Sequence, residues 1–172
     1  MTSAETTYRV RRASATDLPA VLEVLAQNQP ESPPRAPQCA VPPSARQHAT
    51  WEHMNATADL TVYLAVHLIE NSEGGQDREQ SVGTAAMLLM PHLTYDCRPS
   101  AFIEAVVVAY AHRRRGVARL LLHQALEDAR AASCRKVQLL SHKRHAEDGA
   151  HQLYRSLGFI AEAEGFRLYL DP

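Results

Sequence analysis

Three consecutive arginines, Arg113, Arg114 and Arg115, stand directly before Gly116 and a stretch with helical periodicity. Guanidinium groups pair with phosphate oxygens through two hydrogen bonds and keep their charge at any biological pH. A helix N-terminus adds unpaired backbone N–H groups and partial positive charge, and a glycine lets a ligand approach the backbone. The segment therefore predicts an oligophosphate-binding site, although an arbitrary run of charges is more often a solvated loop. It is not a Walker loop, because no Gly-Lys-Ser/Thr follows.

A single carboxylate, Glu104, lies within the otherwise apolar run Ala101–Val108. A strand that is apolar on both sides is typical of the centre of a covered sheet. A charge in such a strand has two interpretations, a role in acid–base chemistry or an ion pair with an arginine, and the sequence leaves both open. His112 and His142 are weaker acid–base candidates, because each is equally consistent with a surface residue.

The elements that position these residues follow from hydrophobic periodicity. Six prolines in the segment 30–43 exclude both helix and strand there and predict a surface loop. The strand, helix and strand that surround the arginines predict a crossover that leaves the two strands adjacent and parallel. The predicted strands are 8–12, 61–70, 81–90, 101–108 and 136–140, with a closing hairpin of 159–163 and 166–170. Four helices are predicted. The first carries Leu18 to Leu25 and is capped by Ser14 or Thr16, the second is 44–56, the third carries Ala118 to Ala129, and the fourth is 149–157. This is an α/β (α+β) pattern.

Composition excludes several classes of protein. The chain has 172 residues, 45% of them hydrophobic, with 18 basic and 19 acidic side chains. This size predicts one domain, 1–172, with a core that needs no disulfide or metal. A pI near 6.7 argues against a nucleic-acid partner, and no apolar stretch is long enough for a membrane span or a signal peptide, so we expect a cytoplasmic protein. Cys39, Cys97 and Cys134 are expected to be reduced thiols, and the scattered histidines predict no metal site.

The charges are unevenly distributed. Residues 1–110 contain 7 basic and 12 acidic side chains, whereas residues 111–155 contain 10 basic and 4 acidic ones. The phosphate-binding candidate therefore lies in a basic segment, and an acidic remainder favours a cationic partner. Abundant Ala, Arg and Pro are typical of a GC-rich genome, which suggests a bacterial source.

Three motifs in order carry a family resemblance. The segment RRRGVA, Arg113–Ala118, resembles the Gln/Arg-x-x-Gly-x-Gly/Ala pyrophosphate signature of the GCN5-related N-acetyltransferases (GNAT). The apolar strand IEAVVV, Ile103–Val108, precedes it, and LYRSLGF, Leu153–Phe159, is similar to the family's closing Phe/Leu-Tyr-x-x-x-Gly-Phe motif. The resemblance covers essentially the whole chain. It implies the GNAT fold, a mixed, centrally splayed sheet of six to seven strands flanked by about four helices.

The resemblance implies acetyl-CoA as the acyl donor and no metal. Pantetheine would pair with the backbone of the central strand at Val106 and Val108, and peptide N–H groups near Val106 would polarise the thioester carbonyl. Tyr154 matches the tyrosine that protonates the departing sulfur, with a packed helix tyrosine as the alternative, and Glu104 is the candidate base, directly or through water. The pantetheine-binding Asn of the family has no counterpart in 146–150. Ser141 or a backbone group could take its place. The expected cofactor contacts are Val106, Val107, Val108, Arg113, Arg114, Arg115, Gly116, Val117 and Ala118.

The sequence thus predicts an N-acetyltransferase for a primary amine of a small, cationic molecule, acting by direct attack. Two alternatives stay open: a peptide or protein acetyltransferase acting on an N-terminus or a lysine, and a non-catalytic acyl-CoA-binding domain. The expected partners are a small-molecule amine, no nucleic acid and no membrane. A homodimer, common in the family, is a further expectation that the sequence cannot show.

Overall fold

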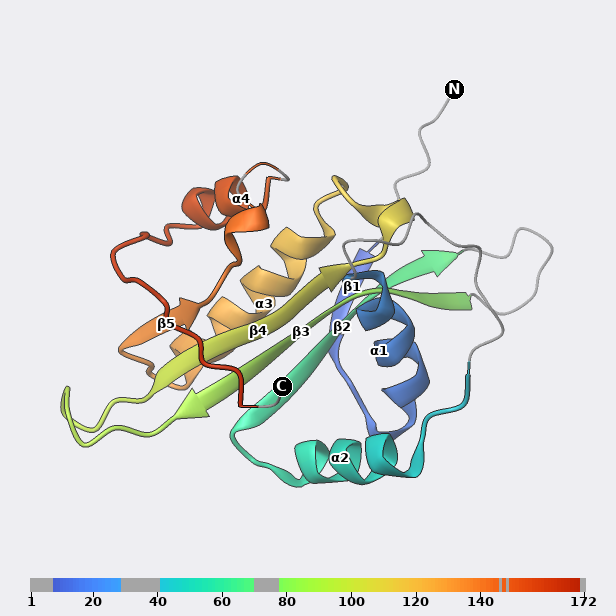
Figure 1. Cartoon of the computed structure of the whole chain (residues 1–172), viewed down its shortest axis with the longest axis horizontal. Helices are drawn as coiled ribbons and strands as arrows, with labels where there is room; N and C mark the ends of the chain where they lie inside the picture. The colour runs from blue at the N-terminus through green and yellow to red at the C-terminus, as the bar shows by residue number, and fades with distance from the viewer. Residues whose placement is uncertain (1–7, 29–40, 70–77, 146, 148, 171–172) are drawn as a thin grey trace. The chain divides into compact units, whose positions relative to one another are not determined.

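The chain forms two compact units, 1–138 and 139–172, in the computed structural model (Figure 1). The structure describes every residue except 1–7, 29–40, 70–77, 146, 148 and 171–172. The predicted Pro-rich loop therefore lies outside the described residues apart from 41–43, and so does most of the predicted turn at 71–80. The single domain expected over 1–172 stays a prediction.

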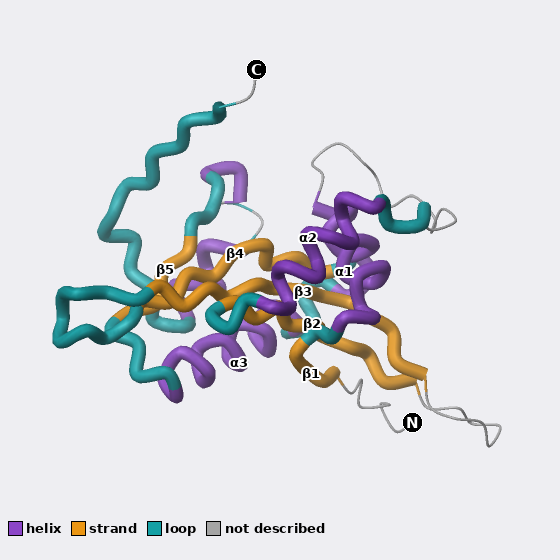
Figure 2. Tube along the Cα trace, turned by 90° about the horizontal axis from the view of Figure 1, so that it is seen from below, coloured by secondary structure: helices purple, strands orange, loops and turns teal. Residues whose placement is uncertain are grey.

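The first unit is built on a five-stranded mixed sheet (Figure 2). Each of the first three strands pairs with the next in an antiparallel ladder, in the order of the sequence. Strand order is therefore β1-β2-β3-β4-β5. The strands are β1 (Tyr8–Arg12), β2 (Leu60–Ile69), β3 (Arg78–Met90), β4 (Ser100–Val108) and β5 (Lys136–Leu139).

The last two strands confirm the predicted crossover. The backbone N–H of Arg135 donates to the carbonyl of Pro99 at 2.7 Å, so β4 and β5 begin at the same level of the sheet. Adjacent strands that begin at the same level run in the same direction, as the helix between them requires. β5 has 4 residues and β4 has 9. Within the described residues of the first unit, the second half of β4 therefore has no strand on its β5 side.

Helices cover the two faces of the sheet (Figure 2). The helices α1 (Leu18–Leu25) and α2 (Ala45–Ala56) lie on one face, where Leu18, Val21, Trp51 and Leu64 form a buried cluster. Helix α3 (Val117–Ala131) lies on the other, where the Tyr63 hydroxyl donates to Asp128 at 2.8 Å. These helices form where the periodicity predicts them. Trp51, whose role the sequence did not indicate, is a core residue whose indole N–H donates to the carbonyl of Ala15.

The closing hairpin is a correction. The second unit contains α4 (Ala150–Ser156), which ends before Gly158 as predicted, but residues 159–170 form no strand. Ile160, Phe166, Leu168 and Leu170 are between 79% and 88% exposed. A two-stranded hairpin needs a buried apolar face to be stable, and these side chains bury none. The described residues therefore contain five strands, against the expected six to seven, with four α-helices.

The start of α3 packs directly on the backbone of β3. A methyl group built on Gly83 would lie 3.0 Å from Val117 Cγ1, 3.1 Å from Leu121 Cδ1 and 3.3 Å from the Val107 carbonyl oxygen. Val117 and Leu121 are themselves fully buried, so they have little room to move away. The absence of a side chain at Gly83 sets how closely the helix N-terminus approaches the sheet.

We expect Gly83→Ala to lower the free energy of unfolding by about 1–3 kcal/mol, because overpacking would force α3 away from the sheet. Urea unfolding followed by circular dichroism measures this change. The exposed Gln80→Ala on the same strand is the control and should stay within about 0.5 kcal/mol of the unchanged protein. A G83A protein as stable as this control would show that the helix is not held at this distance.

Candidate active site

A β-bulge interrupts β4 at the centre of the predicted site. Thr84 pairs with Val107, and Ala86 pairs with Glu104, so the single residue Ala85 of β3 faces two residues of β4. One of those two, Ala105, has a φ of 53°, in the left-handed region that non-glycine residues rarely adopt. The sequence contained no signal for this bulge, because an alanine within an apolar run is typical of a regular strand.

The bulge coincides with a departure from the predicted burial of β4. Glu104 and Ala105 are exposed, although the sequence predicted a strand covered on both faces. The covering is incomplete because α1 packs against only part of β3 and β4 and α2 packs against β2, which leaves the rest of β3 and β4 exposed on this face. Within the described residues Glu104 makes no ion pair, so the arginine-paired interpretation of this carboxylate finds no support.

The open surface beside Glu104 has a defined set of residues. Register places Glu104 in one row with Ala86 of β3 and Val62 of β2, and Val62 packs against the cluster under α1 and α2. The surface therefore belongs to the same side of the sheet as these helices. Leu88 and Met90 are 42% and 37% exposed, and Ala86 and Phe102 are half-buried. We call Ala86, Leu88, Met90, Phe102 and Glu104 the β3–β4 face; it combines one carboxylate with apolar side chains.

The end of β4 leads into the arginine loop. The side chain of Arg113 turns back into the protein: its Nε donates to the Val108 carbonyl at 3.0 Å, and one terminal nitrogen donates to the Gln27 carbonyl at 3.0 Å. Its guanidinium also stacks on the Tyr110 ring, 3.7 Å from the centroid. Gln27 in turn accepts a hydrogen bond from the Tyr110 backbone N–H. Arg113 therefore holds the loop in place with its side chain, and its backbone N–H donates to the Tyr110 carbonyl.

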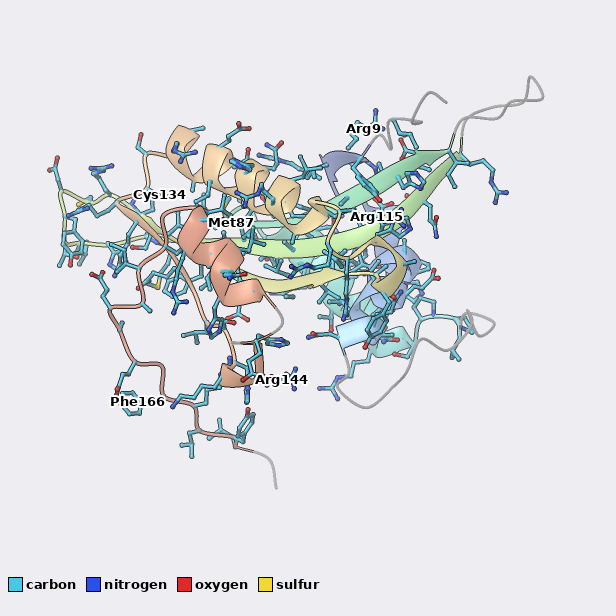
Figure 3. The ribbon with its side chains drawn as sticks, turned by 90° about the horizontal axis from the view of Figure 1, so that it is seen from above. Arg9, Met87, Arg115, Cys134, Arg144 and Phe166 are labelled. Atoms are coloured by element: carbon cyan, nitrogen blue, oxygen red, sulfur yellow. The ribbon has the colours of Figure 1, made fainter. Side chains whose placement is uncertain are left out.

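The loop ends in a glycine that starts α3. Arg114 has a φ of 62° and Gly116 has a φ of 83°, so two left-handed residues turn the chain from β4 into the helix. Nothing lies within 4 Å of a Cβ built on Gly116, which leaves space next to the backbone. The N–H groups of the first helical turn have no partner within the helix. Arg115 is exposed beside them (Figure 3), so the loop has the donors and the charge that a diphosphate requires.

The remaining donor contacts were expected on the backbone of β4. Val106 is half-buried, whereas Val107 and Val108 are buried, so their side chains are anchored in the core. Beyond the end of β5, no strand among the described residues of the first unit pairs with this half of β4, which leaves its backbone groups for an extended ligand arm. The Val108 carbonyl already accepts the hydrogen bond from Arg113, so Val106 is the stronger candidate for pairing with pantetheine.

Tyr154 lies on α4 in the second unit. Its ring packs edge-on against Phe159 with centroids 6.1 Å apart, and its carbonyl accepts a hydrogen bond from the Phe159 N–H. The tyrosine and phenylalanine of the closing motif thus stabilise the end of this helix, and the phenol is half-buried. In the same unit Ser141, the possible substitute for the missing Asn, is hydrogen bonded to His151 at 3.0 Å.

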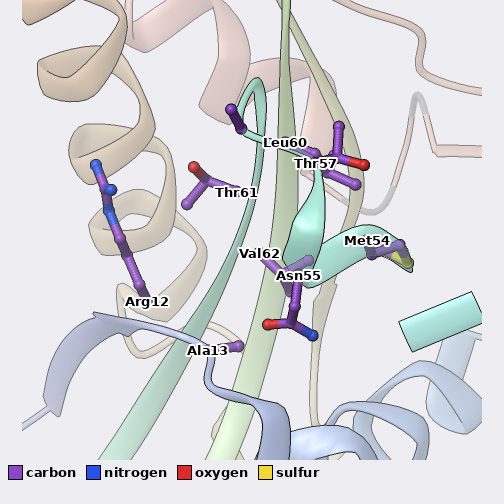
Figure 4. Close-up of a pocket in the computed structure, with 9 residues that line it drawn as sticks. Arg12, Ala13, Met54, Asn55, Thr57, Leu60, Thr61 and Val62 are labelled. Carbon is purple, nitrogen blue, oxygen red and sulfur yellow. The ribbon is translucent and has the colours of Figure 1, made fainter. Parts of the chain in front are cut away.

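A cavity of about 220 Å³ lies away from these residues (Figure 4). It is found where β1 ends and β2 begins, beside the end of α2, and includes Arg12, Asn55 and Thr61. None of the predicted site residues lines it. Among the described residues, no three His, Cys, Asp or Glu side chains gather as metal ligands, and no helix is both long and apolar enough to cross a membrane.

Comparisons with known proteins identify the family and the fold. The sequence profile of the Acetyltransferase (GNAT) family matches residues 35–159. A comparison with curated protein sequences found no match. Among solved structures, a "putative acetyltransferase" from Agrobacterium tumefaciens str. C58 is 33% identical, with 94% of this chain and 99% of that chain covered and a TM-score of 0.70. An acetyltransferase from Trypanosoma brucei is 26% identical, with 95% and 100% covered and a TM-score of 0.71.

A third structure, AAC(6')-Iy in complex with a bisubstrate analog, is 18% identical, covers 97% of this chain and 99% of its own, and has a TM-score of 0.67, which shows the shared fold. The chain belongs to the Acetyltransferase (GNAT) family and is an acetyl-CoA-dependent N-acetyltransferase. The resemblance inferred from the three motifs is thereby confirmed. The roles of the individual site residues stay predictions.

The bulge at Ala105 leads to a test of the site's geometry. A β-branched side chain fits a left-handed backbone poorly, so we expect Ala105→Val to destabilise the protein by about 1–3 kcal/mol and to weaken acetyl-CoA binding. Ala105→Gly, which relieves the strain but adds freedom to the unfolded chain, should stay within about 1 kcal/mol. Thermal unfolding and donor titration measure both. Equal losses for the two variants would contradict a left-handed residue at this position.

Proposed function

We propose that the protein transfers the acetyl group of acetyl-CoA to a primary amine of a small, cationic molecule, which attacks the thioester directly. The observation that carries this proposal is the juxtaposition of four features along β4 and the loop that follows it. An exposed carboxylate is followed by a bulge, then by an open strand edge, and then by a loop with unpaired helical N–H groups. Donor and acceptor could therefore meet at β4.

The donor would be held mainly by backbone groups. When bound, acetyl-CoA supplies an activated acyl carbon and a thiolate leaving group. The loop Arg113–Ala118 offers N–H groups and the charge of Arg115 to the diphosphate, while Arg113 keeps the loop in shape. The open half of β4 next to Val106 would align the extended arm, and backbone N–H groups there would stabilise the oxyanion that forms during attack.

The acceptor would lie on the β3–β4 face. A protonated amine is attracted to a carboxylate, and it becomes nucleophilic only after losing a proton. Glu104 is exposed on this face, two residues before Val106, and can accept that proton directly or through a water molecule. Leu88, Met90 and Phe102 provide apolar contacts for the rest of the acceptor. The excess of acidic residues in 1–110 favours the same cationic class.

Proteins of similar fold support a small-molecule amine as the acceptor. One is described as a glucosamine-6-phosphate N-acetyltransferase from Arabidopsis thaliana, at 16% identity, and AAC(6')-Iy was solved with an analog that joins CoA to an acetylated neamine. Both descriptions concern those proteins. The openness of the β3–β4 face favours a second candidate function, acetylation of a peptide N-terminus or a lysine, because an extended chain can lie on an open surface.

An amine panel distinguishes these functions. We expect release of CoA from acetyl-CoA to saturate with at least one polyamine, aminosugar or aminoglycoside, and to be slower with peptides that carry a free N-terminus or a lysine. Glu104→Gln should lower kcat by about 10²-fold, the usual scale of a general base, whereas the exposed Glu127→Gln on α3 should leave kcat unchanged. Donor binding without turnover for any amine or peptide of the panel would contradict the proposed acceptor classes.

Tyr154 is the proposed general acid that protonates the departing thiolate. We expect Tyr154→Phe to lower kcat by about 10-fold to 10²-fold and to change the dissociation constant of acetyl-CoA by less than about twofold, because the ring and its contact with Phe159 are kept. Tyr169→Phe, which alters an exposed phenol in the same unit, is the control. Unchanged turnover in Y154F would remove this tyrosine from the chemistry.

A further inference from the structure

Three rings from distant parts of the chain meet beside the arginine loop. Tyr8 lies on β1, its register partner His67 on β2, and His112 at the end of the short helix η3 (Tyr110–His112). The His67 ring centroid is 5.3 Å from both the Tyr8 and the His112 centroids. The Tyr8 hydroxyl and His112 Nδ1 form a hydrogen bond of 2.9 Å. The proposed acetyl transfer uses none of these three groups.

The cluster is largely shielded from water. His112 is 8% exposed, and Nδ1 of His67 is buried with no hydrogen-bond partner in the described part of the chain. A buried ring nitrogen without a partner is costly, and such a group in a native protein calls for an explanation. Two adjacent imidazoles with one hydroxyl can accept a proton, but they stabilise the resulting charge poorly unless an anion is near.

His112 is coupled to the loop through the backbone as well as through space. It directly precedes Arg113, and its N–H donates to the Ala109 carbonyl at 2.9 Å. The hydrogen bond to Tyr8 therefore ties the start of the arginine loop to β1, on the opposite edge of the sheet. The charged and titratable groups that face the imidazole are Tyr8 from β1, His67 from β2 and Arg115 from the loop.

These surroundings disfavour the protonated imidazole when no anion is bound. Burial, followed by the neighbouring charges of His67 and Arg115, holds the pKa of His112 below its usual range. The bond to Tyr8 survives a change of protonation state, because the hydroxyl can donate to the neutral ring or accept from the protonated one. Protonation would thus change the charge beside the loop and leave its position unchanged.

We propose that Tyr8 and His112 are positioning residues of the arginine loop, and that binding of the donor's diphosphate to this loop is accompanied by uptake of a proton by His112. The inference deepens the proposed function and rests on its donor site. A diphosphate on Arg113–Ala118 places negative charge beside Arg115, which offsets the repulsion that disfavours protonated His112. The cluster then contributes a positive charge only when the donor is present.

The direction of the pH dependence follows from linkage. If the bound anion raises the pKa of His112, the protonated protein binds the donor more tightly, and affinity falls as pH rises from the pKa of the free protein to that of the complex. Each unit by which binding raises the pKa makes the donor about tenfold weaker across that window. Below the window and above it the affinity is constant.

Isothermal titration calorimetry with 3′-dephospho-CoA tests the inference, because this donor analogue keeps the diphosphate and lacks the monoester phosphate that titrates near neutrality. We expect its dissociation constant to rise about threefold to tenfold between about pH 5.5 and 8. Repeating the titration in two buffers of different ionisation enthalpy should show net uptake of part of a proton. Binding that is independent of pH and takes up no proton would overturn the inference and leave the donor site intact. No binding at any pH would contradict the donor site itself.

Variants assign the proton. His112→Gln should abolish proton uptake and retain donor binding, whereas the exposed His123→Gln on α3 should leave both unchanged. His67→Gln removes a repulsive neighbour and should move the window to higher pH, which gives a second test if H112Q does not fold. Tyr8→Phe should weaken donor binding severalfold at every pH while proton uptake persists. Proton uptake of normal size in H112Q, or an unmoved window in H67Q, would assign the proton elsewhere.

Discussion

At Gly83 the backbone of β3 comes into van der Waals contact with the first turns of α3, and the proposed donor site depends on this approach. The same contact includes the Val107 carbonyl of β4. Three elements, β3, β4 and α3, therefore meet at Gly83, which has no side chain to keep them apart. This contact places the start of α3 next to the end of β4. The unpaired N–H groups of the helix and the open edge of the strand thereby become neighbours, which is what an elongated ligand with a charged diphosphate requires.

The loop between these elements is stabilised chiefly by the protein's own contacts. Arg113 bonds to the carbonyls of Val108 and Gln27 and stacks on Tyr110, and His112 bonds to Tyr8. A loop with left-handed residues at 114 and 116 is conformationally demanding, so these contacts supply order that a ligand would otherwise have to impose. A preorganised loop loses less conformational entropy when it binds an anion. Of the three arginines, the first acts within the protein and Arg115 is exposed toward solvent.

The distribution of charge gains a structural meaning. Near neutrality of the whole chain hides a basic loop at one end of β4 and an exposed carboxylate two residues before the open edge. The proposed transfer from a polyanionic donor to a cationic acceptor needs both signs of charge close together. The bulge at Ala105 separates the two surfaces along one strand, because it turns Glu104 and Ala105 to solvent while Val107 and Val108 remain in the core.

The sequence by itself determined the order of elements, the family and the position of the loop. Hydrophobic periodicity, Gly116 and the run of arginines are local signals, and local signals survive without tertiary information. Tertiary structure alone decided the rest. The bulge arises from pairing between β3 and β4. The fold brings Arg113 next to Gln27, which is 86 residues away in sequence. It also brings Tyr8 to His112, which is 104 residues away. The hairpin expected at 159–170 failed for the same reason: alternating residues form a strand only where a partner buries one of their faces.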